Sequence, residues 1–470
     1  MIVLHLSLQE NDEPLYVQVY QQIKQQIRNG TLPENERLPS KRQLAAQMQI
    51  SVNTVSAAYS QLVSEGFLVA KPQRGFFVCH LDELIQTSHT EIKQPQTVRT
   101  KPSVLVDFSI SDVARDKFPF QAWRKTMNKC FNEYDPGLLT STPPQGDYAL
   151  RQAIARYLYQ ARGVSCTAEQ VIIGAGNDNL LQMLSYILDS SCTIGMENPV
   201  YHKAMHFFQR MGHSVKSIPV DEHGIQIEPL ESLDNIAIYV TPSHQFPLGI
   251  TMPISRRIKL LNWSQEGSSR YIIEDDYDSE FRYNSRPVPA LQSLDQNSRV
   301  IYLGTFSKSI APSLRISYMV LPLPLLKQYL EQYLLFSSAV SRFEQAVLHE
   351  FITSGHFETH LNKMRKLYRT RGQDLVQALS VFGNQLQIFG EGAGLYLTVQ
   401  LKNGLSETEM CKKAEEAGVK VYPISPYFTG PVPEEHQSKV LLGFGALTAE
   451  QMQQGVDLLY KAWIENQKSS

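Results

Sequence analysis

The sequence predicts a two-part protein, in which a small trihelical unit with a β-hairpin precedes a large α/β domain built on a mostly parallel sheet. Three observations predict this. The chain of 470 residues exceeds one ordinary domain. Its first eighty residues carry three helical patterns and then two strand patterns, and the remainder alternates strands with helices. Hydrophobic residues at 42% and charged residues at 19% are typical of globular proteins and exclude a largely disordered chain.

The overall charge and the cysteines exclude several other classes. A formal net charge of −2 argues against a generally basic nucleic-acid binder. The five cysteines are scattered and never spaced as C-x-x-C, so neither a disulfide framework nor a zinc site is indicated. The N-terminus lacks the basic region of a signal peptide, and the apolar runs are too short to span a bilayer. We therefore expect a soluble cytoplasmic protein with no membrane partner.

The first unit begins with three amphipathic helical patterns. Apolar residues at four-residue spacing predict a helix within 14–30, which ends at a glycine. Ser40 is suited to cap a second helix over 41–48. Ser51 is suited to cap a third, whose apolar positions follow the helical period as far as Gly66. These three helices predict a trihelical core.

The spacing and charge of this unit indicate a nucleic-acid reader. Only 49–51 separate the second and third helices, as in a helix-turn-helix, whose second helix enters the major groove of DNA. Strand patterns at 67–70 and 76–78, joined by 71–75, then complete the outline of a winged helix. The stretch 37–79 holds five cations and one acid, a net charge of +4, and the cations lie where phosphates would lie. From helix spacing alone, a packing module with a solvated charged face is an equal alternative.

A change of composition separates the two parts. Residues 80–103 contain two prolines, few apolar residues and no periodicity, which is typical of a flexible linker. The sequence thus predicts a DNA-binding domain over 1–79, a linker over 80–103 and a large domain over 104–470.

The large domain contains short apolar runs that are rich in β-branched residues and are separated by roughly thirty residues or more. They lie at 170–174, 236–240, 271–275 and 300–304. Such runs are typical of a mostly parallel sheet, in which ligands bind at the carboxyl ends of the strands. The residues that follow each run are therefore the candidates for a site.

Those residues include an amine, carboxylates and a turn suited to an anion. After the first run, Gly176 and Asn177 open a helix whose backbone amides can bind an anion, although the third glycine of the dinucleotide fingerprint is absent. Asp275 ends the third run, and Lys308 follows the fourth. Alone, Lys308 is most simply a solvated loop cation. Together these groups match the needs of an aldehyde cofactor with a phosphate and a pyridine nitrogen.

The residue strings of the first unit resemble a known family. Leu38-Pro39-Ser40-Lys41-Arg42-Gln43-Leu44-Ala45 and Arg74-Gly75-Phe76-Phe77-Val78 closely resemble the GntR-type winged helix. The family often has Arg where this chain has Val52, which leaves the operator sequence open. The resemblance implies binding to operator or promoter DNA through residues of the second helix, the third helix and the wing. These are Ser40, Lys41, Arg42, Ser51, Asn53, Thr54, Lys71, Arg74 and Gly75.

The strings of the large domain resemble a second family. Those at 271–281 and 304–315 are similar to the fold-type I aminotransferases, which bind pyridoxal 5'-phosphate. The order of winged helix, linker and aminotransferase-like domain resembles the MocR/GabR group of pyridoxal-phosphate-dependent transcriptional regulators over essentially the whole chain. The resemblance implies an α/β fold whose winged helix-turn-helix precedes a fold-type I domain.

The resemblance also implies a role for each matching residue. Lys308 would form the internal aldimine as the catalytic residue, Asp275 would pair with the pyridine nitrogen, and Tyr277 would lie near the phenolic oxygen. The ring of Tyr201 would stack on the cofactor. The phosphate would be held by residues at the start of one helix and around the lysine, namely Gly176, Asn177, Asp178, Thr305, Ser307 and Arg315.

Three positions depart from the working enzymes and from the amino-acid-sensing regulators. Phe246 stands where many aminotransferases place an Asn that binds the phenolic oxygen. Lys203 and Ala446 stand where relatives have carboxylate-binding arginines. A guanidinium holds a carboxylate with two hydrogen bonds, which an ammonium cannot do. We therefore expect Lys203 to contact an effector that is different from γ-aminobutyrate.

These residues lead to two hypotheses. The first is a transcriptional regulator, a head-to-tail homodimer by resemblance, that senses a small amine, an amino acid or the cofactor itself and retains at most residual transaminase activity. The alternative is an active aminotransferase with an accessory N-terminal domain. His202 and His206 are four residues apart, but the glutamate of the H-E-x-x-H motif is missing, so no metal site is expected.

Overall fold

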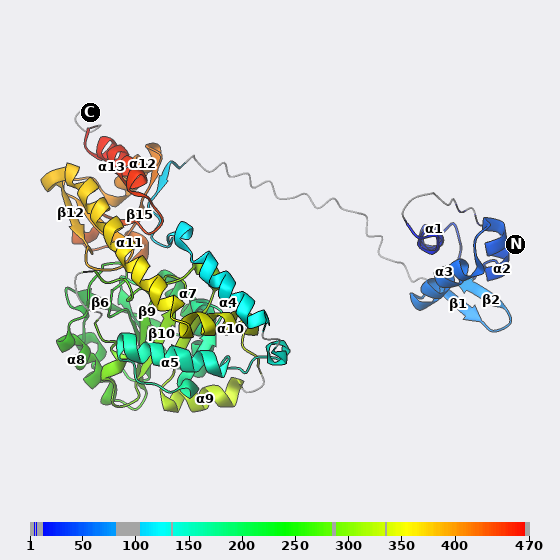
Figure 1. The fold of residues 1–470 in the computed structure, drawn as a ribbon, viewed down its shortest axis with the longest axis horizontal. Coiled ribbons are helices and arrows are strands. Elements are labelled where there is room, and N and C mark those ends of the chain that lie inside the picture. The colour runs from blue at the N-terminus through cyan, green and yellow to red at the C-terminus, as the bar shows by residue number, and fades with distance from the viewer. Residues whose placement is uncertain are drawn as a thin grey trace. The chain divides into compact units, whose positions relative to one another are not determined.

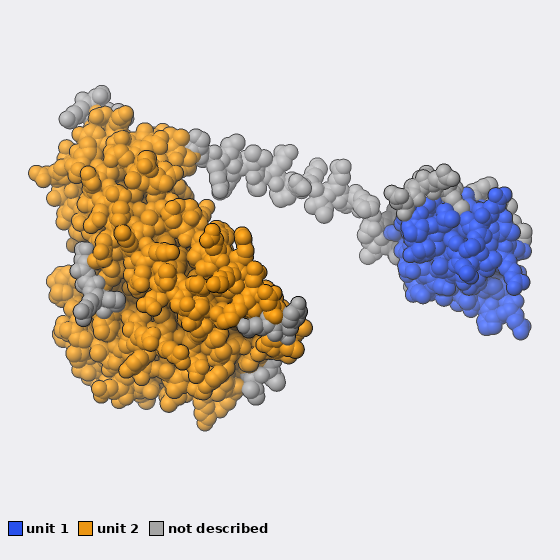
Figure 2. All heavy atoms as spheres, viewed as in Figure 1, with its two compact units in different colours: residues 1–100 blue, residues 101–470 orange. Residues whose placement is uncertain are grey.

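The computed structural model describes residues 13–80, 104–132, 135–283, 288–333 and 336–465, together with Leu4 and Leu6. The chain divides into two compact units, residues 1–100 and 101–470, which Figure 2 distinguishes by colour. Apart from His80, the predicted linker lies outside the described residues. Within the described ranges, no helix combines the length and the apolarity needed to cross a membrane.

The first unit contains three helices and a β-hairpin (Figure 1). The helices are α1 (Leu15–Arg28), α2 (Lys41–Met48) and α3 (Val52–Ser64). The antiparallel strands β1 (Leu68–Lys71) and β2 (Gly75–Val78) follow. This order and these bounds are those of a winged helix-turn-helix.

Local capping and a small apolar core explain the helices. Ser40 and Gln43 form a capping box at the start of α2, and Ser51 accepts a hydrogen bond from the backbone of Thr54 at the start of α3. Tyr59 is fully buried, and its hydroxyl donates to the carbonyl of Pro39 at 3.0 Å. The apolar stripes of the three helices meet the hairpin through buried residues that include Val19, Ile23, Leu44, Val55, Leu62, Leu68 and Val78.

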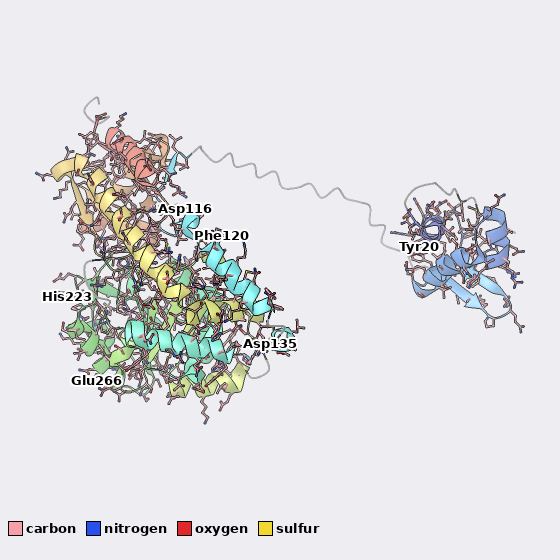
Figure 3. The ribbon with its side chains drawn as sticks, viewed as in Figure 1. Tyr20, Asp116, Phe120, Asp135, His223 and Glu266 are labelled. Carbon is pink, nitrogen blue, oxygen red and sulfur yellow. The ribbon has the colours of Figure 1, made fainter. Side chains whose placement is uncertain are left out.

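A polar cluster on the surface joins α1 to the end of α3. The Nζ atom of Lys24 lies 2.6 Å from Glu65 Oε2, and the hydroxyl of Tyr20, labelled in Figure 3, lies 2.7 Å from both oxygens of Glu65. Lys24 also lies over the ring of Phe67, 4.9 Å from its centroid. The cluster links α1 to the end of α3 at the margin of their shared core, against which Tyr20 and Phe67 also pack.

The second unit is built on an eight-stranded sheet with the strand order β4-β11-β10-β9-β8-β5-β6-β7. The pairs from β10 through β6 are parallel, whereas β10–β11, β11–β4 and β6–β7 are antiparallel. The sheet is therefore mostly parallel, as the spacing of the apolar runs predicts. In chain order the strands are β4 Val171–Gly174, β5 Thr193–Asn198, β6 Val215–Asp221, β7 Gly224–Ile225, β8 Ile236–Val240, β9 Arg270–Asp276, β10 Val300–Thr305 and β11 Ser317–Val320.

Helices cover both faces of this sheet. Alternate residues of a strand face opposite sides, so Ile172 packs in one apolar cluster while Val171 and Ile173 pack in another. The first cluster includes residues of α6, α7 and α9, and the second includes residues of α5 and α10. The helices of this region are α4 Phe120–Asn132, α5 Tyr148–Arg162, α6 Asn177–Ile187, α7 His202–Arg210, α8 Ile254–Gln265, α9 Leu323–Tyr333 and α10 Arg342–Thr353.

A second, antiparallel sheet forms a C-terminal lobe with its own core (Figure 1). Its strand order is β12-β13-β16-β15. The long helix α11 (His356–Leu379) lies along this lobe and contacts α13. The remaining elements of the lobe are β12 Leu386–Phe389, β13 Tyr396–Leu401, α12 Glu407–Glu416, β14 Val419–Lys420, β15 Tyr422–Pro423, β16 Lys439–Gly443 and α13 Ala449–Trp463.

The start of the large unit also belongs to this lobe. Strand β3 (Val106–Asp107) pairs in parallel with β14. The amide of Leu105 donates to the carbonyl of Gly418 at 2.8 Å, and the amide of Gly443 donates to the carbonyl of Phe108 at 2.8 Å. The chain therefore enters the second unit through its C-terminal lobe.

Candidate cofactor site and nucleic-acid interface

The candidate cofactor residues of the second unit lie at the carboxyl edge of the eight-stranded sheet. Strands β9 and β10 are parallel, with Asp275 opposite Leu303. Strand β11 runs back beside β10 and places Ser317 opposite both Thr305 and Gly174. The ends of β4, β9 and β10 therefore meet, as expected for a ligand site in a parallel sheet.

Asp275 is a buried carboxylate at the end of β9. It accepts hydrogen bonds from the hydroxyl of Tyr239 and, at 3.4 Å, from Asn177 Nδ2. Burial raises the pKa of Asp275 to about 6, and the hydrogen bond from Tyr239 opposes that shift. A protonated ring nitrogen would relieve the cost of burying this charge. Sequence reasoning missed Tyr239, because it lies inside a uniformly buried strand.

Lys308 follows β10, and its amine points to the start of the large unit. Its Nζ atom donates to the carbonyls of Ile110 at 3.1 Å and Ser111 at 2.9 Å. Burial lowers the pKa of Lys308 to about 8, and the nearby carboxylate of Asp278 opposes the shift. A lowered pKa increases the fraction of neutral amine, which is the nucleophilic form. The environment of Lys308 thus suits condensation with an aldehyde.

Tyr277 is held by a histidine, which is itself bonded to a carboxylate. Its hydroxyl donates to the carbonyl of His244 at 3.0 Å, and its ring stacks on the imidazole at an interplanar angle of 26°. The Nδ1 atom of His244 donates to Asp278 Oδ2 at 2.9 Å, and both side chains are buried. The sequence pattern did not single out His244, because it lies in a turn between two prolines.

An aromatic cluster surrounds Phe246. Its ring makes edge contacts with Tyr201, at 5.9 Å between centroids, with Tyr277 at 6.1 Å and with Tyr427 at 4.8 Å. Burial raises the pKa of Tyr201 to about 12, so this phenol stays neutral near pH 7. Because its side chain is a hydrocarbon ring, Phe246 brings no polar atom to the neighbourhood of Tyr277.

The start of α6 and Arg315 form a cradle suited to an anion. Gly176 precedes the helix with a φ of +84°, and a Cβ built on it would lie 2.6 Å from Arg315 Cζ. Arg315 Nη2 lies 3.0 Å from Asp178 Oδ2. Backbone amides at a helix start and a guanidinium both favour phosphate. The carboxylate of Asp178 would repel phosphate, so only its backbone amide suits the role predicted for it.

Two hydroxyls complete this edge. The hydroxyl of Thr305 donates to Ser307 Oγ at 3.0 Å and accepts from the amide of Ser307 at 3.1 Å and from Ser317 Oγ at 2.8 Å. An amine, a buried carboxylate, a phenol and an anion cradle therefore share one edge of the sheet. This donor set fits pyridoxal 5'-phosphate.

The two positions at which relatives have carboxylate-binding arginines differ in their exposure to solvent. Lys203 is exposed on α7, and Ala446 is half-buried after Gly445. A buried guanidinium does lie near the second position, because Arg371 of α11 donates to the carbonyl of Gly445. Arg371 Nη2 also lies 3.9 Å from Asp116 Oδ1, a residue labelled in Figure 3. Its place in the middle of a long helix gave no sequence signal.

Among the described residues, histidines and acids do not gather into a metal-binding group. His202 and His206 are in edge contact, with 5.6 Å between ring centroids. Across the described ranges, no group of three or more His, Cys, Asp or Glu residues could hold a metal ion.

The first unit presents a candidate nucleic-acid interface on α2, α3 and the wing. Asn53 and Ser51 are exposed at the start of α3, where Ser51 Oγ lies 2.8 Å from Thr54 Oγ1. Arg42 and Arg74 are exposed, and neither forms an ion pair with another described residue. Their charges are free to meet phosphates.

The other predicted DNA contacts are tied into the unit. Lys41 Nζ donates to Ser56 Oγ at 2.9 Å, and Lys71 lies over the ring of Phe77, 4.7 Å from its centroid. Arg37 belongs to the positive stretch 37–79 but was not named among the individual DNA contacts. It is exposed, and its Nε atom would lie 3.5 Å from a Cβ built on Gly75 of the wing.

Two family models match the chain. Residues 103–459 match "Aminotransferase class I and II", and residues 15–78 match "Bacterial regulatory proteins, gntR family". Among solved structures, the multiple substrate aminotransferase from Thermococcus profundus has a TM-score of 0.70 and is 26% identical. The match covers 81% of this chain and 97% of that one.

Full-length relatives also match. The chain is 43% identical to "Uncharacterized HTH-type transcriptional regulator YdeL" of Bacillus subtilis, over 96% of this chain and 97% of the relative. It is 32% identical to "Probable rhizopine catabolism regulatory protein MocR" of Rhizobium meliloti, over 97% and 95%. It is also 32% identical to "HTH-type pyridoxine biosynthesis transcriptional regulator PdxR" of Corynebacterium glutamicum, over 91% of each.

Proposed function

Because this chain belongs to the family of HTH-type transcriptional regulators that carry an aminotransferase class I and II domain, we propose that it binds DNA and senses a small molecule through pyridoxal 5'-phosphate held at Lys308. One observation carries the proposal. A single chain combines a half-buried amine, just after the strand next to the one that carries Asp275, with a winged helix on which Arg42 and Arg74 are exposed.

Each cofactor role rests on the contacts described above. When bound, the cofactor supplies an aldehyde that condenses with amines and a pyridine ring that withdraws electrons. Lys308 would provide the amine, Asp275 would hold a proton at the ring nitrogen, and Tyr277 would serve the phenolic oxygen. The ring of Tyr201 would cover the cofactor. The phosphate would be held by the start of α6 and the residues around the lysine, namely Gly176, Asn177, Asp178, Thr305, Ser307 and Arg315.

The effector is a small amine, an amino acid or the cofactor itself. Lys203 and Ala446 provide no guanidinium for a carboxylate, which disfavours γ-aminobutyrate. One relative is named a pyridoxine biosynthesis regulator, which supports the cofactor as a candidate. An amine panel tests this hypothesis through the visible absorbance of the bound cofactor. If γ-aminobutyrate changed the spectrum as readily as every other amine, the hypothesis would be wrong.

Self-association is part of the proposal. Large apolar side chains are exposed on α4, on the short helix η2 (Pro136–Leu139) and on α10, which contacts both. Phe131 of α4 and Phe343 of α10 stack with 5.5 Å between centroids. The cluster consists of Phe120, Met127, Phe131, Leu139 and Phe343. A second copy would cover this surface, and a two-fold dimer would present two winged helices to a two-fold operator.

An active aminotransferase is the alternative, and the nearly complete donor set favours it. Against it stand Phe246 and the absence of arginine at 446. Robust transfer of an amino group to a keto acid, unaffected by deletion of residues 1–79, would support the enzyme and not the regulator.

Two sets of variants test the regulator. Lys308→Ala should abolish the visible absorbance of the bound cofactor, whereas Lys327→Ala, an exposed lysine of α9, should retain it. Arg42→Ala combined with Arg74→Ala should abolish binding to operator DNA without changing the absorbance. Arg28→Ala, an exposed arginine at the end of α1, is the matched control for DNA binding. If the double variant bound DNA as tightly as the parent, the assignment of the interface would be wrong.

A further inference from the structure

We propose that the backbone carbonyls of Ile110 and Ser111 form a docking site for Lys308 when its amine is free, so that bonding of this amine to the cofactor releases the segment through which the chain enters the large unit. The inference rests on the proposed function, because it requires that the cofactor bind at Lys308. It adds a way in which a chemical change at the cofactor site could alter the segment that connects the large unit to the DNA-binding unit.

The contact joins two parts of the large unit. Lys308 follows β10 of the eight-stranded sheet, whereas Ile110 and Ser111 lie three and four residues after β3, a strand of the C-terminal lobe. The amine donates to the two carbonyls at 3.1 and 2.9 Å. Hydrogen bonds from a charged donor are among the stronger ones in proteins. The free amine thus fixes this segment to the edge of the main sheet.

Two glycines allow the segment to lie where the amine can reach it. A Cβ on Gly443 would lie 2.1 Å from the carbonyl oxygen of Ser109, and a Cβ on Gly445 would lie 2.4 Å from that of Asp112. Residues 109–112 therefore pack directly against the backbone of these two glycines, at and just after the end of β16. Further hydrogen bonds hold each side, including the amide of Ala114 to the hydroxyl of Tyr368 at 3.1 Å.

Covalent chemistry at Lys308 would remove these hydrogen bonds. When Nζ condenses with the aldehyde carbon, the carbonyl oxygen leaves as water and the nitrogen keeps at most one hydrogen. A free ammonium has three N–H donors and can satisfy both carbonyls, whereas the bonded nitrogen cannot. When another amine replaces Lys308 at that carbon, Nζ regains its hydrogens and can return to Ile110 and Ser111.

The released segment is close in sequence to the attachment of the first unit. The structure describes the large unit from Val104 onward, and Val104 lies six residues before Ile110. The hydrogen bonds of this stretch include those from the amide of Leu105 to the carbonyl of Gly418 and from the amide of Phe108 to the carbonyl of Lys420. A change at Lys308 therefore acts within six residues of the point where residues 1–103 join.

Hydrogen exchange of backbone amides tests this inference on the full chain in three states. The states are the protein without cofactor, with pyridoxal 5'-phosphate, and with the cofactor plus methoxyamine, which takes the aldehyde carbon from Lys308. We expect exchange at Leu105, Phe108 and Ala114 to become about tenfold faster when the cofactor binds. Methoxyamine should restore slow exchange while the cofactor's phosphate stays bound. The amide of Leu38, which donates to Phe76 in the first unit at 2.9 Å, is the internal control.

The variant Lys308→Met separates the possible outcomes, because it keeps the length of the side chain and removes its donors. It should show fast exchange at the same three amides in every state. Unchanged exchange in the parent, in spite of normal cofactor absorbance, would overturn the docking site and leave the proposed function intact. Absence of cofactor absorbance in the parent would overturn both.

Discussion

Gly176 is a position at which the backbone conformation and the available space both favour glycine. Its φ of +84° is rarely adopted by other residues, and a Cβ there would lie 2.6 Å from the guanidinium carbon of Arg315. The position therefore combines a backbone requirement with a steric one.

We expect Gly176→Ala to weaken binding of pyridoxal 5'-phosphate by at least about tenfold, because Arg315 must move away from the start of α6. Absorbance titration measures the change. Gly212→Ala is the matched control, because Gly212 has a similar φ of +93° and no atom within 4 Å of a built Cβ. If both variants lost the same affinity for the cofactor, backbone strain alone would account for the effect of Gly176→Ala.

Glu197 is a buried carboxyl at the end of β5, 2% exposed. Its Oε2 atom accepts hydrogen bonds from the amide of Thr241 at 3.1 Å and from the hydroxyl of Thr241 at 3.0 Å. Burial raises the pKa of Glu197 to about 7, and the hydrogen bonds from Thr241 only partly oppose this shift. The protonated form is therefore favoured in the folded chain.

A raised pKa has a definite consequence for stability. The contribution of Glu197 is fully present below the ordinary pKa near 4.5 and is lost as the pH rises through about 7. Glu197→Gln should lack this dependence, which amounts to at most about 3 kcal/mol. Urea unfolding of the larger unit between pH 4.5 and 7 measures it. The exposed Glu228→Gln is the control, and an unchanged pH profile in Glu197→Gln would contradict the prediction.

At this scale the sequence predicts residues at or shortly after the ends of strands, because strand ends can be recognised from apolar runs. Asp275, near the end of β9, and Lys308, shortly after β10, are of this kind. Tyr239 and His244, which contact Asp275 and Tyr277, could not be predicted, because their partners come from other strands and turns.

The helices of the winged unit depend on local capping. Ser40 begins α2 with a capping box that satisfies two backbone donors. Ser40→Ala should destabilise the first unit by about 1 kcal/mol. Thermal unfolding monitored within the full chain measures the loss. Ser60→Ala, an exposed serine inside α3, should change stability far less, and equal losses would argue against the cap.

At the scale of elements, periodicity predicts the helices of the first unit and the buried strands of the main sheet. The antiparallel C-terminal lobe was not predicted. Strands β14 and β15 contain two residues each, which is too short for a periodic pattern. The pairing of β3 with β14 also joins Val106 to Val419, across more than three hundred residues.

On the scale of the whole molecule, binding to DNA should depend strongly on salt, because phosphate contacts release counterions. Each phosphate contact contributes about 0.9 to the slope of log K against log salt concentration. Arg42→Ala and Arg74→Ala, each made alone, should therefore reduce the slope by about 1 in titrations over a salt series. Arg28→Ala should leave it unchanged, and a loss of affinity without a change of slope would indicate contacts to bases.

Self-association can be tested through the exposed apolar cluster. Leu139 is 80% exposed on η2, and Phe131 is 47% exposed on α4. Leu139→Asp combined with Phe131→Glu should shift the chain to a monomer in sedimentation velocity. Ile254→Asp, at an apolar residue of α8 that is 57% exposed, should not do so. A parent chain that sediments as a monomer at every concentration would refute the proposed dimer.

The short pairing of β3 with β14 also has a mechanical meaning. Tension transmitted along the chain from residue 103 would act first on a parallel ladder of two residues, next to the hydrogen bond between Leu105 and Gly418. The eight-stranded sheet would carry no load until that ladder had opened. The segment through which the chain enters the large unit would therefore unfold first, at low force, and the rest of the large unit would stay folded.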